Sequence, residues 1–145
     1  GRLALLAENL IMMDSSSMDD RALKEMLEVI RKKKVKCLVG YSSALGELSR
    51  YIDAQGMDTS KFRVQAIIPI SESMPPAVRS RLREQFRCPV RAWYSNEENG
   101  IMGLQHPEEE SYYIDKENSY YEILKLDRDE QGETGELGSH VITEL

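Results

Sequence analysis

Short apolar runs alternate with amphipathic stretches along the first 93 residues, and this alternation constrains the fold more than any other feature of the sequence. The apolar runs have the length of strands and are Asn9–Met13, Val35–Val39, Arg63–Pro69 and Val90–Trp93. The stretches between them are long enough for helices, which favours parallel strands joined by right-handed crossovers. We therefore expect a sheet with helices on both of its faces.

Each intervening stretch has the features of an amphipathic helix. The first helix is expected to begin near Ser17, with Asp20 as its capping-box acid. The second is expected to end at Gly56, and the third to begin at Pro75 and Pro76. Apolar residues at helical spacing predict the buried faces: Leu23, Met26, Leu27 and Ile30; Ala44, Leu45, Leu48, Tyr51 and Ile52; Val78, Leu82 and Phe86.

The pattern changes after Gly103. Strands are expected at Ser111–Asp115, Tyr120–Asp127 and Glu136–Thr143, and alternation of apolar and polar residues predicts antiparallel pairing. The predicted fold class is α/β: a doubly wound, mainly parallel sheet with flanking helices, followed by a C-terminal antiparallel β section. We divide the chain into an α/β subdomain (1–103) and a β-strand section (104–145). Because the sequence starts at Gly1 and stops within a strand, we expect a fragment, truncated at its C-terminus.

Charge is unevenly distributed along the chain. Residues 1–95 hold 16 Lys and Arg against 11 Asp and Glu, whereas residues 96–145 hold 3 against 14, which gives the overall net charge of −6. This balance argues against nucleic-acid binding. The sequence contains no signal peptide and no apolar run long enough to span a membrane. Cys37 and Cys88 lie in apolar runs and are interpreted as core thiols, which favours a reducing, cytoplasmic location.

Three polar loops follow predicted strands: Gly40–Ser43, Ile70–Ser73 and Tyr94–Gly100. The carboxyl ends of parallel strands are where α/β sheets bind ligands, so these loops suit a nucleotide or an acyl-adenylate. Glu97 or Glu98 could supply a carboxylate oxygen to Mg²⁺. The serines of the first loop are more simply explained as helix caps.

The two histidines, His106 and His140, lack partners at metal-ligand spacing. We interpret them as surface or packing histidines.

Several stretches match the motifs of a known enzyme family. Gly40 to Leu45 resembles Gly-Tyr-Pro-Ser-x-Leu, and Pro69 to Glu72 occupies the place of a Gly-Ala-Glu loop. Tyr94 to Gly100 is similar to Tyr-Gly-x-[Ser/Thr]-Glu-x-Gly. Two later stretches, 121–124 and 135–145, match strand motifs of the same family. In order and spacing these motifs resemble adenylate-forming enzymes of the phenylacetate–CoA ligase type, including CapK-like relatives of capsular polysaccharide biosynthesis. The resemblance covers nearly the whole chain and implies a fragment of the large N-terminal domain.

The resemblance implies that the full-length protein activates a carboxylic acid with ATP, giving an acyl-AMP and pyrophosphate, and then transfers the acyl group to a thiol such as coenzyme A. It assigns roles to loop residues of this chain. Glu98 would hold Mg²⁺, with Glu97 as the alternative if the register shifts by one. The remaining residues would border the ligands: Tyr94, Ser95 and Asn96 at the adenine and acyl phosphate, Ser71 and Glu72 at the adenine, and Tyr41, Ser42 and Ser43 on the substrate side.

The sequence departs from the family pattern at Ser95, which replaces a glycine, and at Glu97, which replaces Ser or Thr. The family's glycine-rich phosphate loop, ribose-binding aspartate and catalytic lysine are absent from these 145 residues. We therefore expect the isolated chain to be inactive and to hold no cofactor tightly. The identity of the acid, the choice of coenzyme A or a carrier protein as acceptor, and homodimerisation stay open. The alternative is a non-catalytic, flavodoxin-like binding or interaction module.

Overall fold

The computed structural model describes residues 9–107, 109–117 and 119–144. Of residue 144 it describes the backbone alone. Its contacts group the chain into two compact units, Gly1–Ala92 (unit 1) and Trp93–Leu145 (unit 2). The boundary predicted after Gly103 falls inside strand β4 (Gly100–Gln105). Leu145, the last residue of the matched strand motif, lies outside the described residues.

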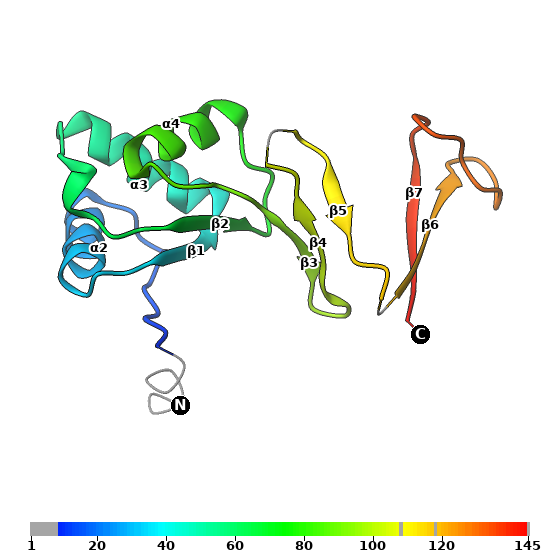
Figure 1. Ribbon diagram of the computed structural model, residues 1–145, viewed down its shortest axis with the longest axis horizontal. Helices are drawn as coiled ribbons and strands as arrows, with labels where there is room; N and C mark the ends of the chain where they lie inside the picture. The colour runs from blue at the N-terminus through cyan, green and yellow to red at the C-terminus, as the bar shows by residue number, and fades with distance from the viewer. Residues whose placement is uncertain (1–8, 108, 118, 145) are drawn as a thin grey trace. The chain divides into compact units, whose positions relative to one another are not determined.

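Unit 1 is a parallel α/β layer. Strands β1 and β2 lie side by side and are parallel, with Cys37 opposite Ala66 and Tyr41 opposite Ile70 (Figure 1). A single parallel bridge from Val90 to Ile67 extends this pairing. The elements of unit 1 are α2 (Asp20–Lys32), β1 (Cys37–Tyr41), α3 (Ser42–Ala54), the 3₁₀ helix η1 (Thr59–Lys61), β2 (Ala66–Ile70) and α4 (Pro76–Phe86).

The core of unit 1 is built from the predicted helix faces. Leu27, Ile67 and Leu82, from α2, β2 and α4, are each no more than 1% exposed and belong to one cluster of apolar side chains. Burying each such side chain contributes roughly 1.5–3 kcal/mol. The helical stripes that sequence periodicity predicts are therefore confirmed, with their central residues in the cluster: Leu23, Leu27 and Ile30; Leu45, Leu48 and Ile52; Leu82 and Phe86.

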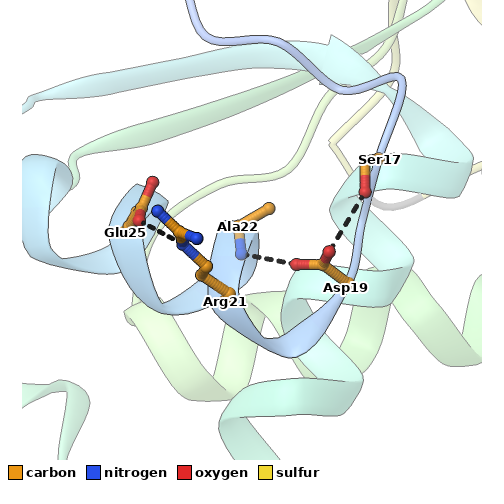
Figure 2. Close-up of polar contacts among 5 residues, drawn as sticks. All are labelled: Ser17, Asp19, Arg21, Ala22 and Glu25. Carbon is orange, nitrogen blue, oxygen red and sulfur yellow. Dashed lines mark hydrogen bonds and ion pairs between the residues drawn. The ribbon is translucent and has the colours of Figure 1, made fainter.

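Helix α2 begins three residues later than predicted and uses a different cap. The side chain of Asp19 accepts a hydrogen bond from the backbone N–H of Ala22 at 2.8 Å, while the Ser17 hydroxyl donates to the other Asp19 oxygen at 3.4 Å (Figure 2). The carboxylate of Asp19 thus satisfies one of the free N–H groups of the first turn. Asp20, predicted to close a capping box, is the first helical residue.

We expect Asp19→Ala to lower the free energy of unfolding by about 1 kcal/mol, because it removes this cap. Ser17→Ala is the matched control and should change stability by less than about 0.5 kcal/mol, since its bond is long and exposed. Urea denaturation followed by the helical circular-dichroism signal measures both. If Ser17→Ala lowered the free energy of unfolding more than Asp19→Ala, Ser17 would be the cap after all.

One side of β1 is exposed, which corrects the interpretation of Cys37 as a core thiol. The strand begins at Cys37 rather than at Val35, and alternate residues point to opposite faces. Cys37, Val39 and Tyr41 share the outward face and are exposed, while Leu38 packs against the core. Cys88 is buried, as predicted.

The apolar run Asn9–Met13 was expected to be a strand and is not one. Leu10, Ile11 and Met12 are between 48% and 75% exposed and lie in irregular backbone before α2. An apolar run becomes a strand only where a neighbouring strand completes its hydrogen bonds, and within the described residues none pairs with this one.

Unit 2 is antiparallel throughout. Its strands form two sheets, β3-β4-β5 and β6-β7, and every pair is antiparallel. The predicted antiparallel section is therefore confirmed, and with unit 1 it confirms the predicted α/β fold class. The strands are β3 (Trp93–Asn96), β4 (Gly100–Gln105), β5 (Tyr112–Ile114), β6 (Ser119–Lys125) and β7 (Gly138–Glu144).

The predicted strand Val90–Trp93 is divided between the two units. Val90 makes only the bridge to Ile67, whereas Trp93 opens β3 and pairs with Leu104 of β4. The stretch Tyr94–Gly100 is consequently the end of β3, a turn and the start of β4, and not a loop beyond a parallel strand. Gly100 (φ 66°) takes the left-handed conformation that glycine adopts without strain and so allows the chain to reverse.

Candidate functional site

The loops after β1 and β2 meet at the start of α3. The Ser42 hydroxyl donates to the backbone carbonyl of Glu72 at 2.9 Å. The backbone N–H of Ser43 donates to Glu72 Oε2 at 2.8 Å, and its hydroxyl lies 3.2 Å from Oε1. The structure therefore brings together two of the three loops that the sequence singles out.

Glu72, and not a serine, caps helix α3. The helix makes no hydrogen bond to the side chain of its own N-cap residue, Tyr41. The Glu72 carboxylate takes that place and also lies at the positive end of the helix dipole. The N–H of Ser43, and then its hydroxyl, lower the pKa of Glu72 from its ordinary value of 4.5. The predicted capping role of the serines is corrected: their hydroxyls bind the Glu72 residue instead.

We expect Glu72→Gln to weaken unit 1 at neutral pH and to lose this effect in acid. A carboxyl whose pKa is lowered by folding stabilises the fold above its ordinary pKa, and this contribution disappears as the pH falls through the folded value. Urea unfolding of the unchanged chain and of Glu72→Gln across pH 7 to 3 measures the difference in their free energies of unfolding. Ser43→Ala is the control and should keep most of the pH dependence, because the backbone N–H remains. A difference in free energy of unfolding that does not change with pH would contradict the assignment of the Glu72 carboxylate as the cap of α3.

A hollow of about 380 Å³ adjoins this contact between α3, α4 and the loop after β2. Its size is within the range of small-ligand sites. Charges of both signs line it: Glu47 pairs with Arg50, and Glu72 and Arg81 also belong to the lining. The polar lining comprises Ser42, Ser43, Glu47, Arg50, Glu72, Ser73 and Arg81.

The third predicted loop forms the tip of the β3–β4 hairpin in unit 2. Asn96 shapes this turn, because its Oδ1 accepts the backbone N–H of Asn99 at 2.7 Å. Glu97 and Glu98 are exposed in the turn that follows. The expectation that all three loops follow strands of one parallel sheet is therefore wrong, because this turn belongs to the antiparallel β3-β4-β5 sheet. That the three loops contribute to one site stays a prediction.

Ser95 fits its position without backbone strain. It lies in β3 and is absent from the residues with positive φ. A glycine-only conformation is therefore not needed here, although the family pattern has glycine at this place.

Within the described residues, no three His, Cys, Asp or Glu side chains gather closely enough to form a metal cluster. No helix among them is both long and apolar enough to cross a membrane.

Sequence reasoning missed a contact between Tyr94 and His140. Tyr94 Oη and His140 Nδ1 lie 2.9 Å apart, although the residues are separated by 46 positions. The interpretation of His140 as a packing histidine is supported, because its ring also stacks on Tyr94 and Tyr121. No local pattern could have revealed this pairing, since it depends on how β3 and β7 come together.

Comparison with known proteins gives one weak sequence match. The chain is 28% identical over 102 residues to Protein CapK of Staphylococcus aureus, which covers 70% of this chain and 22% of that protein. The chain thus spans about a fifth of the length of this curated relative. No protein-family model matches the sequence.

Several solved structures with a similar fold are CoA ligases. A long-chain-fatty-acid-CoA ligase from Archaeoglobus fulgidus matches 84% of this chain with 27% of its own (TM-score 0.73, 14% identity). An open conformation of 2-hydroxyisobutyryl-CoA ligase, in complex with 2-HIB-AMP and CoA, matches 87% of this chain with 30% of its own length (TM-score 0.72, 14% identity). A benzoate CoA ligase from Burkholderia xenovorans LB400 matches 83% with 25% of its own (TM-score 0.67, 11% identity).

These identities establish a shared fold and leave substrate and activity unassigned. Taken with the CapK match, the chain is a segment with the fold of the adenylate-forming, CoA-ligase-type superfamily, which confirms the resemblance that its motifs predict.

Proposed function

We propose that this chain is part of an ATP-dependent acyl-adenylating ligase. The full-length enzyme would join a carboxylic acid to AMP with release of pyrophosphate, and would then pass the acyl group to a thiol, usually coenzyme A. The observation that carries the proposal is the fold shared with CoA ligases, one of them crystallised with an acyl-AMP and CoA. The motifs of this chain follow in the order that the superfamily has them.

Within unit 1, the proposed roles fall on the loops after β1 and β2. Because the carboxylate of Glu72 is bound to Ser43, the backbone of Ser71 and Glu72 is what we assign to the adenine. Ser71 has a φ of 62°, which turns the backbone sharply after β2. Tyr41, Ser42 and Ser43 are assigned to the substrate side, next to the hollow that Ser42 and Ser43 line.

Within unit 2, the proposed roles fall on β3 and the turn that follows it. We assign Tyr94, Ser95 and Asn96 to the adenine and the acyl phosphate, and Glu98 to Mg²⁺. The exposed carboxylate of Glu98 fits this ion, which takes one or two protein carboxylates and completes its shell with water and substrate phosphates. When bound, Mg²⁺ would offset charge on the phosphates. Because ATP and coenzyme A are the co-substrates, we place the enzyme in the cytoplasm.

Acid-dependent exchange of pyrophosphate into ATP tests the proposal. The longer protein that contains these residues should exchange label only when a suitable acid is present, and a panel of aromatic, aliphatic and hydroxy acids would identify the class. The 145-residue chain alone should show no exchange. Binding of ATP without exchange for any acid would favour the alternative, a non-catalytic binding module.

A further inference from the structure

Four aromatic rings from four strands of unit 2 form one cluster. Tyr94 on β3 lies 5.9 Å from Tyr112 on β5, and 5.6 Å from His140 on β7, between ring centroids. His140 in turn stacks on Tyr121 of β6 at 5.5 Å and 19°. The cluster joins the β3–β4–β5 sheet to the β6–β7 hairpin.

The His140 ring is placed to orient the Tyr94 hydroxyl. Stacking against Tyr94 (27°) and Tyr121 (19°) limits rotation of the imidazole. Its Nδ1 then lies 2.9 Å from Tyr94 Oη, a good hydrogen-bond distance. Neutral histidine accepts at Nδ1 only in the tautomer that carries its proton on Nε2, so the tyrosine hydroxyl donates in that state.

Without His140, Tyr94 would keep its contact with Tyr112 but would lose the hydrogen bond that orients its hydroxyl. It is 38% exposed and is followed at once by a register shift in the β3–β4 pairing, between Tyr94 and Ser95. A half-exposed tyrosine with fewer contacts samples more side-chain orientations, and binding a ligand then costs the entropy of ordering it. His140 removes that cost in advance.

We propose that His140 is a positioning residue, which holds Tyr94 in the orientation that binds the nucleotide. This inference rests on the proposed function, which assigns Tyr94 to the adenine and acyl phosphate. The family resemblance assigns no role to His140. In this proposal it acts through Tyr94 and does not contact the ligand.

The test compares Tyr94→Phe, His140→Phe and the double variant in the longer protein. Both single substitutions keep an aromatic ring and remove the hydrogen bond. Each should raise KM for ATP about fivefold, the usual worth of one hydrogen bond, with kcat little changed. The double variant should be no worse than either single one, because both remove the same bond. His106→Phe is the matched control: His106 packs against Tyr113 at a tilted angle in the same unit, and its substitution should leave KM unchanged.

A second measurement does not depend on activity. Nitrogen-15 NMR of the 145-residue chain, at a pH where its histidines are neutral, should show His140 with its proton on Nε2, and Tyr94→Phe should shift the Nδ1 signal of His140. Protonation at Nδ1 would overturn the inference. The inference also fails if Tyr94→Phe raises KM and His140→Phe does not, and the proposed function then survives. If the tautomer is as expected but neither variant changes KM, the nucleotide role of Tyr94 fails, and the positioning role with it.

Discussion

Glu98→Gln is expected to slow adenylation by the longer enzyme by about 10²-fold or more, whereas Glu97→Gln should change it little. The substitution keeps the shape of the side chain and removes the charge that we assign to Mg²⁺. That interaction matters most as charge develops on the phosphates, so the loss should fall mainly on kcat. The size corresponds to the removal of one preorganised electrostatic group. Glu97→Gln removes a negative charge near phosphate and could even raise the rate.

Pyrophosphate exchange by both variants across a Mg²⁺ titration makes the comparison. The two residues are neighbours, both exposed in the turn between β3 and β4, so each is the matched control for the other. A crippled Glu97→Gln beside a near-normal Glu98→Gln would mean that the register is off by one residue. If neither substitution matters, the assignment of this turn to the metal is wrong.

Leu82→Ala should lower the free energy of unfolding of unit 1 by about 2–5 kcal/mol. Leu82 is 0% exposed in α4 and belongs to the cluster that contains Ile67 and Phe86. Truncation removes buried apolar surface and leaves a cavity that close-packed neighbours fill only in part. Domains of this size are stable by roughly 5–15 kcal/mol, so this one change could unfold much of the population.

Leu10→Ala is the matched control, since it makes the same change at a 50% exposed residue of unit 1. It should cost less than about 0.5 kcal/mol. Urea denaturation followed at the helical circular-dichroism signal reports on unit 1, because the helices of the described chain lie there. Equal losses in the two variants would contradict the core that the structure assigns.

Helices could be predicted from the sequence better than strands. The stripes of α2 and α4 repeat over three turns, so Leu23, Leu27 and Leu82 were assigned correctly to the core. Strands β1 and β2 are only five residues long and their limits depend on partners elsewhere in the chain. The sequence pattern therefore places β1 two residues early and puts Cys37 on the wrong face. The prediction of a strand at Asn9–Met13 is wrong for the same reason: its composition suits a strand, but no strand among the described residues pairs with it.

The candidate site was predictable in its residues but not in its contacts. Ser42, Ser43 and Glu72 were chosen for lying after strands, and the structure brings them together. That Glu72 caps α3 across 29 positions could not be read locally, because serine at a helix start is the stronger sequence signal. The pairing of Tyr94 with His140 likewise depends on the fold of unit 2.

The transfer of carboxylate oxygen tests the central claim most directly. The longer enzyme would be given its acid labelled with ¹⁸O in the carboxylate, together with ATP, Mg²⁺ and coenzyme A, and the products would be analysed by mass spectrometry. When the carboxylate attacks the α-phosphorus, one of its oxygens stays on that phosphorus after the thiol takes the acyl group. The account therefore predicts one labelled oxygen in AMP and none in pyrophosphate. Label in inorganic phosphate, or unlabelled AMP beside a thioester product, would contradict it.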